Sequence, residues 1–230
     1  MRISTRVEKV LENKSIYCYS NGVLKNKLNI KDKEELDKVE ASLSYLRLRK
    51  LEESDIRFSF DTKYYLQLHN FIFQDIYNFA GEIRSENISK SVKVNINGET
   101  ENIPFCRPEF IYTCLKEILE KMKKNALQIK TYDEYIEYLS YYYAEINIIH
   151  PFREGNGRTQ REYFRQLVEV LNKYLPLNNI YLDYSDLNEL NRNNLIQGCI
   201  NSAFSGDLTL LKEFFKSTLK EKEYDKTKTV

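Results

Sequence analysis

The chain is very poor in the two residues that chain reversals need, with seven glycines and four prolines in 230 residues. Tight turns, hairpins and phosphate-binding loops depend on them, because glycine tolerates positive φ and proline fixes φ. A β-sandwich, a β-barrel or a glycine-rich doubly wound fold is therefore disfavoured. The shortage favours an all-α fold, which the 30% content of charged residues also fits.

Apolar residues recur at helical spacing along most of the chain, which indicates helices that bury one face. Pro108 is well placed as the first residue of one of them. The predicted helices span residues 32–51, 61–78, 108 to at least 122, 133–149, 158–174, 186–203 and 208–222.

One segment alternates apolar and polar residues instead. Val92 to Ile96 and Glu99 to Ile103 flank Asn97-Gly98, a pattern typical of two short strands around a type I′ turn. A two-stranded hairpin is marginal alone. It is either a connector packed on the helices or an open strand edge that docks an extended peptide.

Charge and cysteine content restrict the protein class. A net charge of +1 gives no broad footprint for nucleic acid or an anionic membrane. The four scattered cysteines indicate reduced thiols. No signal peptide or membrane span is recognisable, so we expect a cytoplasmic protein that does not bind a membrane or, directly, nucleic acid. The oligomeric state stays open.

Three of the scarce glycines and prolines lie in one stretch, His150-Pro151-Phe152-Arg153-Glu154-Gly155-Asn156-Gly157-Arg158-Thr159-Gln160-Arg161. Pro151 ends the preceding helix, and Gly155 and Gly157 allow a tight turn with left-handed dihedrals. Backbone N–H groups at the next helix start, together with Arg158, make this turn an anion site. Arg161 lies one turn further on the same face, so two guanidinium groups could hold successive phosphates.

Two further groups in this stretch suit chemistry at phosphorus. Glu154 supplies a carboxylate, and phosphate-bound Mg²⁺ takes one or two of these from a protein. The unperturbed pKa of a histidine suits a general base at neutral pH, so His150 is the candidate for that role. His69, the only other histidine, lies on an apolar helix stripe and is expected to be structural. The stretch predicts a base that deprotonates a hydroxyl attacking phosphorus.

The stretch resembles the signature of the Fic (filamentation induced by cAMP) family, H-x-F-x-[D/E]-G-N-G-R-x-x-R, at every fixed position. The likeness continues through residues 79–84, the hairpin and residues 206–208. It implies a Fic-type helical bundle with a short β-hairpin flap beside the active site. The expected single domain comprises an N-terminal helical region (1–55), a core (56–215) with the flap at about 91–105, and a C-terminal helix end and tail (216–230).

The resemblance also implies an activity. Fic enzymes transfer AMP from ATP to a Ser, Thr or Tyr hydroxyl of a target protein and release pyrophosphate. His150 would accept the hydroxyl proton, and Glu154 would hold Mg²⁺ across the α- and β-phosphates. The other implied roles are α-phosphate binding by Gly155, Asn156 and Gly157, β-phosphate contact by Arg158, γ-phosphate binding by Arg161 and loop anchoring by Phe152. The flap residues expected to dock the target are Val92, Lys93, Val94, Asn95 and Ile96.

Alternatives to this activity remain. Arg161 favours AMP transfer over a Doc-like kinase, because such kinases typically lack the second arginine. Nothing in the signature selects a base, so another donor such as UTP, GTP or CDP-choline stays open. The alternative of another class is an inactive helical interaction module.

Two hypotheses remain for how the activity is inhibited. Residues 22–28 resemble the N-terminal region of Fic proteins inhibited by a separate small antitoxin, which is the partner we expect. Other Fic proteins carry an internal inhibitory helix, [S/T]-x-x-x-E-[G/N]. The pairs Ser4/Glu8 and Ser217/Glu221 have that spacing, but neither glutamate is followed by Gly or Asn.

Overall fold

The computed structural model describes residues 15–54, 57–93, 100–175, 180–184 and 189–221. Within them the fold is mostly helical, which confirms the all-α prediction with a small antiparallel hairpin. The helices are α1 (Lys33–Glu52), α2 (Thr62–Phe73), α3 (Pro108–Ala126), α4 (Tyr132–Ile149), α5 (Asn156–Leu171), α6 (Glu189–Ser205) and α7 (Thr209–Thr218). The strands are β1 (Ser89–Lys93), β2 (Thr100–Pro104), β3 (Ile180–Leu182) and β4 (Leu219–Glu221).

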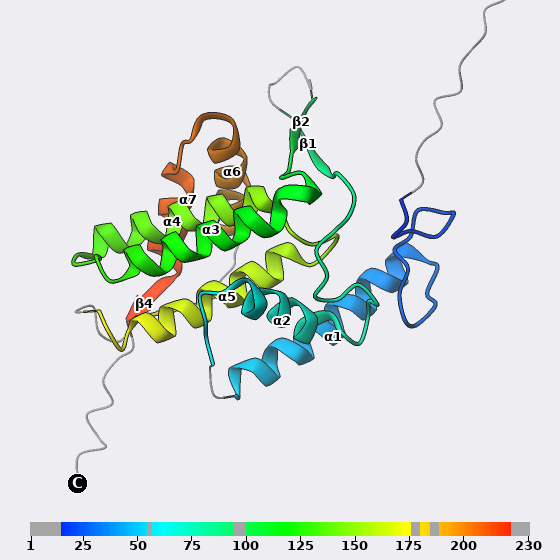
Figure 1. Ribbon diagram of the computed structural model, residues 1–230, viewed down its shortest axis with the longest axis horizontal. Coiled ribbons are helices and arrows are strands. Elements are labelled where there is room, and N and C mark those ends of the chain that lie inside the picture. The colour runs from blue at the N-terminus through cyan, green and yellow to red at the C-terminus, as the bar shows by residue number, and fades with distance from the viewer. Residues whose placement is uncertain (1–14, 55–56, 94–99, 176–179, 185–188, 222–230) are drawn as a thin grey trace, which may run out of the picture.

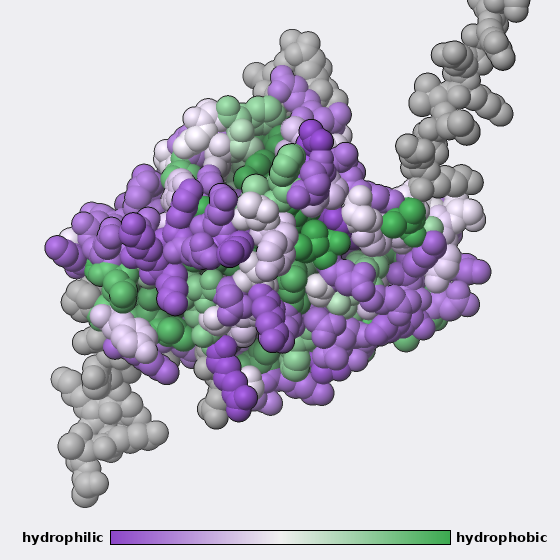
Figure 2. Space-filling view, in the orientation of Figure 1, coloured by the Kyte–Doolittle hydropathy of each residue, from purple (hydrophilic) through white to green (hydrophobic). Residues whose placement is uncertain are grey.

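Helix α5 runs through the middle of the bundle (Figure 1). It packs against α2 and α4, while α1 packs on α2 and α3 packs on α4. Helices α6 and α7 pack on each other and both contact α4. Hydrophilic residues cover the outward side of α3 (Figure 2). The signature stretch therefore begins at the end of one central helix, α4, and continues into another, α5.

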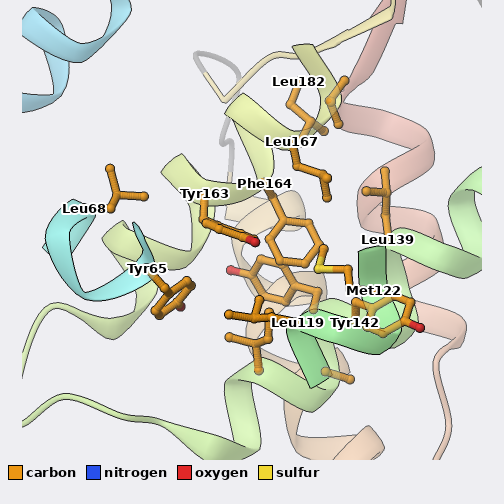
Figure 3. Close-up of a cluster of buried hydrophobic side chains, with 14 of the residues drawn as sticks. Tyr65, Leu68, Leu119, Met122, Leu139, Tyr142, Tyr163, Phe164, Leu167 and Leu182 are labelled. Carbon is orange, nitrogen blue, oxygen red and sulfur yellow. The ribbon is translucent and has the colours of Figure 1, made fainter. Parts of the chain in front are cut away.

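The core is rich in aromatic side chains, which explains how a chain with 18 tyrosines remains helical. Tyr65, Tyr163 and Phe164 of α2 and α5 lie among leucines of the same two helices and of α3, α4 and β3 (Figure 3). Buried tyrosines need a partner for the hydroxyl group. Tyr138 donates to the carbonyl of Met122 at 2.9 Å. Buried residues of helices α1 to α7, including Leu195 of α6, join in one continuous core, and the boundaries expected at 55 and 215 stay predictions.

Local signals explain where the helices begin. Asp32 and Asp61 cap α1 and α2 by accepting from backbone N–H groups in the first turn. Thr131 and Glu134 form a reciprocal capping box at the start of α4. Pro108 is the first residue of α3, as predicted.

Several helix boundaries differ from the predictions, including the end of α5 at Leu171 instead of 174 and the end of α6 at Ser205 instead of 203. Three other differences have a local explanation or change the fold. Helix α2 ends at Phe73 instead of 78, because the chain turns there and the Ile76 carbonyl accepts from the N–H of Lys27 at 2.8 Å. Helix α5 begins at Asn156, two residues early. Helix α7 ends at Thr218, where β4 pairs with β3, a three-residue ladder that the sequence pattern did not indicate. Among the described residues no helix combines the length and apolarity of a membrane span.

An antiparallel hairpin is present as predicted, but in another register. Val92 lies opposite Glu101, whereas a two-residue turn at Asn97-Gly98 would place it opposite Ile103. β1 and β2 are antiparallel, with Ser89 opposite Pro104 and Lys93 opposite Thr100. Val92 and Ile103 are buried, so one face of the ladder packs on the protein. The expected Asn97-Gly98 turn and three of the expected flap residues, Val94, Asn95 and Ile96, lie outside the described residues.

Candidate active site

His150 follows the last residue of α4 in a left-handed conformation, with φ 47° and ψ 63°. The helix ends before Pro151 as predicted, although steric restriction by proline alone favours an extended conformation. A side chain with a Cβ is strained there by roughly 1 kcal/mol or more. Contacts elsewhere must therefore hold His150 in place.

The imidazole of His150 is neutral and has one nitrogen fixed. Its Nδ1 lies 3.2 Å from the Asn147 carbonyl. Nδ1–H therefore donates there, and the lone pair stays on Nε2. The ring stacks on Phe105, with centroids 3.8 Å apart. Burial lowers the pKa of His150 to about 4, the Asn147 hydrogen bond opposes the change, and Arg84 and Lys90 add to it. At neutral pH the ring can accept a proton.

Gly155 makes the tight turn before α5, with φ 80°. A Cβ at this position would lie 2.3 Å from a ring carbon of Phe73, so only glycine fits. No side chain caps the N-terminus of α5, whose first N–H groups suit an anion. The expectation of a left-handed Gly157 is wrong, because Gly157 lies within α5. A Cβ there would lie 3.2 Å from Nη1 of Arg161.

Asn156 and Phe152 hold this loop together. The Asn156 side chain accepts from the Phe152 N–H at 2.9 Å and donates to the Phe152 carbonyl at 2.7 Å. The Phe152 ring is fully buried and stacks on His69, with centroids 3.7 Å apart. The side-chain amide of Asn156 is therefore used inside the loop, which leaves its backbone N–H as the group for an anion.

His69 supports the loop from α2. Its Nδ1 accepts from the N–H of Gly81 at 2.8 Å, and its Nε2 donates to the carbonyl of Glu154 at 2.9 Å. Burial lowers the pKa of His69 to about 4. With both nitrogens engaged it cannot act as a base, which agrees with the structural role expected for it.

Arg158 points toward α1. It forms an ion pair with Glu40 and donates to Ser44 Oγ at 2.9 Å. Its guanidinium also lies over the ring of Phe73, 4.8 Å from the centroid. Burial raises the pKa of Glu40, and Arg158 opposes that rise. Sequence reasoning missed Glu40 and Ser44, because nothing in the α1 pattern separates them from solvent-facing polar residues.

Glu154 is the available carboxylate. Its side chain is 41% exposed, and its Oε1 lies 3.8 Å from the Arg158 guanidinium and accepts from the Gly155 N–H at 2.9 Å. In the described part of the chain no three His, Cys, Asp or Glu side chains cluster as a metal site. A single exposed carboxylate beside a phosphate-binding turn fits Mg²⁺ that arrives with its phosphates and water.

A cavity of about 200 Å³ joins the signature stretch to α6 and the hairpin. His150, Gly157 and Arg161 line one part of it, with Tyr143 beside Arg161. The remaining wall comes mainly from apolar side chains of α6 and from the hairpin residues Lys90 and Ile103: the α6 residues are Leu195, Ile196, Cys199, Ile200 and Ala203. The lining combines His150, Arg161 and Lys90 with apolar side chains, a mixture that suits a nucleotide.

Comparisons with known proteins agree on one family. The Fic/DOC family model matches residues 59–168. "Probable protein adenylyltransferase y4lH" of Sinorhizobium fredii is 33% identical over 199 residues, which cover 84% of this chain and 90% of that protein. "Protein adenylyltransferase VbhT" of Bartonella schoenbuchensis is also 33% identical, over 64% of this chain, but the chain spans only 29% of that longer protein.

Solved structures show the same fold. The BepC protein of Bartonella tribocorum with bound AMPPNP superposes with a TM-score of 0.73, at 20% identity over 90% of this chain and 97% of that one. An N-terminal Fic domain of Bartonella quintana with bound ADP gives a TM-score of 0.74, at 22% identity over 90% of this chain and 95% of that one.

Proposed function

This chain belongs to the Fic/DOC family, and we propose that it is a protein adenylyltransferase. It transfers AMP from ATP to a Ser, Thr or Tyr hydroxyl of a target protein, and to itself, and releases pyrophosphate. One observation carries the proposal. A neutral imidazole, whose Nε2 has no hydrogen-bond partner in the part of the chain that the structure describes, lies on the same cavity as Arg161 and Gly157 of α5.

The transfer follows from this geometry. The target hydroxyl oxygen attacks the α-phosphorus while Nε2 of His150 takes its proton. The bond from the α-phosphorus to the bridging oxygen breaks, and pyrophosphate leaves with the electron pair. Fixed positive charge around the phosphates stabilises this transition state without a covalent enzyme intermediate.

The phosphate contacts are assigned on the same basis. The backbone of Gly155, Asn156 and Gly157 holds the α-phosphate, for which the Gly155 N–H has to be released from Glu154. Arg161 holds the γ-phosphate. Arg158 contacts the β-phosphate, for which its guanidinium has to be shared with Glu40 or released from it.

Glu154 would hold Mg²⁺ through its exposed carboxylate. A bound Mg²⁺ neutralises phosphate oxygens and aligns them for in-line displacement. The hydrogen bond from the Gly155 N–H to Glu154 Oε1, at 2.9 Å, holds this carboxylate beside the start of α5.

The hairpin is the proposed flap for the target. β1 has the residues Val92 and Lys93 of the expected docking segment, and an extended target segment adds to its edge by main-chain hydrogen bonds. Strand addition would fix the register in which one hydroxyl reaches the cavity.

A separate antitoxin remains the proposed inhibitor, in the cytoplasm, as part of a toxin–antitoxin pair. The internal alternative at Ser217/Glu221 required both residues on one helix. Glu221 instead lies in β4 opposite Ile180, and Ser217 donates to the Phe214 carbonyl at 2.8 Å. Ser4/Glu8 lies outside the described residues.

The test is transfer of label. With Mg²⁺ and ATP labelled at the α-phosphate, the wild-type chain should label itself or a lysate protein, and His150→Ala should abolish the label. Label from the γ-phosphate alone would identify a kinase instead. No transfer from ATP, UTP, GTP or CDP-choline would leave an interaction module, and mass spectrometry of labelled bands identifies the target.

A further inference from the structure

Arg84 is a buried arginine that the transfer described above does not use. Its side chain is only 1% exposed, the largest among the fully buried side chains. No ion pair joins it to a carboxylate within the part of the chain that the structure describes. Its guanidinium is satisfied by the backbone alone.

Every hydrogen bond of the Arg84 side chain goes to a main-chain carbonyl. Nε donates to His150 at 2.8 Å and Nη1 to Glu86 at 2.6 Å. Nη2 donates to Cys106, and also to Ile149 at 3.4 Å. The Arg84 backbone N–H adds a bond to the Pro151 carbonyl at 2.9 Å. Arg84 therefore donates to three consecutive carbonyls at the end of α4, those of Ile149, His150 and Pro151.

These contacts place a cation where a helix favours one. The last carbonyls of a helix lack intrahelical partners and carry partial negative charge. Helix α4 has no basic residue in its own last turn, so Arg84 supplies that charge from another segment. Burial without such partners would be costly for a guanidinium.

The Arg84 guanidinium holds the backbone on both sides of the stack between the His150 and Phe105 rings. On one side it holds the carbonyl of His150, which is strained in its left-handed conformation. On the other it holds the carbonyl of Cys106, the residue after Phe105. The Cys106 N–H also donates to the Ile148 carbonyl at 3.0 Å. The separation between the two stacked rings is therefore set by backbone that Arg84 ties together.

We propose that Arg84 is a positioning residue for AMP transfer. It holds His150 and Cys106, the residue that follows the hairpin by two positions, together so that the imidazole faces the cavity. The proposal rests on the proposed function, because it assigns His150 the role of base. A merely structural arginine would support folding without affecting the orientation or electrostatics of that ring.

The test uses Arg84→Lys, which keeps the charge and loses the fork of donors, and Arg84→Gln, which loses both. Arg49→Gln is the control, an exposed arginine paired with Glu52 on α1. We expect kcat for AMP transfer to fall about 100-fold in both Arg84 variants, as displacement of a catalytic group does. KM for ATP should change little, and the control should match the wild type.

A second measurement does not depend on activity. The chain has only two histidines, so an NMR titration reports His150 once His150→Ala identifies its signals. Arg84 and Lys90 are the cations that act on this ring. Loss of one of them in Arg84→Gln should raise the pKa of His150, whereas Arg84→Lys should leave it nearer the wild-type value.

The outcomes are distinct. A folded Arg84→Gln or Arg84→Lys variant with wild-type kcat and wild-type His150 titration overturns the proposal. If neither variant melts cooperatively, Arg84 is a folding residue only and the proposal also fails. If the wild type transfers no AMP, the proposed function fails, while the titration still tests the link between Arg84 and His150.

Discussion

His69 and His150 show how much a single residue depends on its surroundings. Burial lowers the pKa of both to about 4. His69 has hydrogen bonds at both nitrogens, whereas His150 has one at Nδ1 and faces a cavity with the rest of its ring. Only His150 has a nitrogen available for a substrate proton. The available Nε2, and not the pKa, therefore distinguishes the proposed catalytic base from the structural histidine.

Gly155→Ala tests the anion turn. The substitution strains a residue at φ 80° and brings a methyl group to 2.3 Å from Phe73. We expect a loss of about 2 kcal/mol or more in the free energy of unfolding and loss of AMP transfer. Urea unfolding and label transfer measure the two effects.

Gly22→Ala is the matched control for this change. Gly22 has φ 85° with no atom within 4 Å of an added Cβ. It should lose only about 1 kcal/mol, from backbone strain alone, and keep full activity. Equal losses in the two variants would show that the contact with Phe73 is not limiting.

Among the elements, α1 contacts the candidate active site, although the family model begins after it, at residue 59. Its residues Glu40 and Ser44 hold Arg158, and Glu40 also accepts from the hydroxyl of Tyr77. The Glu40 and Arg158 side chains are 11% and 23% exposed. This contact ties the N-terminal region to the signature stretch.

Glu40→Gln should therefore destabilise the protein. It leaves a largely buried guanidinium without its carboxylate, at a cost of about 2 kcal/mol in the free energy of unfolding. Because Arg158 is then free to reach phosphate, we expect KM for ATP to fall or stay constant. Urea unfolding and ATP titration check the two expectations.

The pair of Arg47 and Asp75, at 2.6 Å, supplies the comparison, because its carboxylate is 42% exposed whereas that of Glu40 is 11% exposed. Asp75→Asn should cost less than about 1 kcal/mol, as surface ion pairs do. If Glu40→Gln lowers the free energy of unfolding by no more than this, the contact between α1 and Arg158 stabilises the protein no more than a surface ion pair does. A double variant of Glu40 and Arg158 would then behave additively.

The sequence allowed the helices, the hairpin and the signature residues to be predicted, because their signals are local. Periodicity, the caps at Asp32 and Asp61, and Pro108 all lie within the elements they define. The β3–β4 ladder was missed because three residues are too few for a pattern. Glu40 and Arg84 were missed because their partners lie 118 and 66 residues away in the chain.

At the scale of the whole molecule, the two histidines make stability depend on pH. Both have a pKa near 4 when folded, against an ordinary value of 6.5. Between these values the unfolded chain binds protons that the folded chain does not, so stability falls as pH is lowered from 6.5 toward 4. The upper bound is roughly 3 kcal/mol for each histidine at the low end of this range.

His69→Gln isolates one contribution. Urea unfolding of this variant should show a shallower loss of stability between pH 6.5 and 4 than the wild type shows. The comparison has to be a difference, because burial raises the pKa of Glu40 and Glu145, and protonation of these groups acts in the opposite direction. Parallel pH curves would contradict the prediction.

The attachment of the hairpin has a mechanical consequence. Cys106, just after β2, is hydrogen-bonded to Ile148 in the last turn of α4, and Arg84 donates to the carbonyls of both Cys106 and His150. The hairpin is thus attached at one end, where hydrogen bonds join Cys106 to the last turn of α4. If targets add to β1 as proposed, we expect targets of different shape to displace the strands without moving His150.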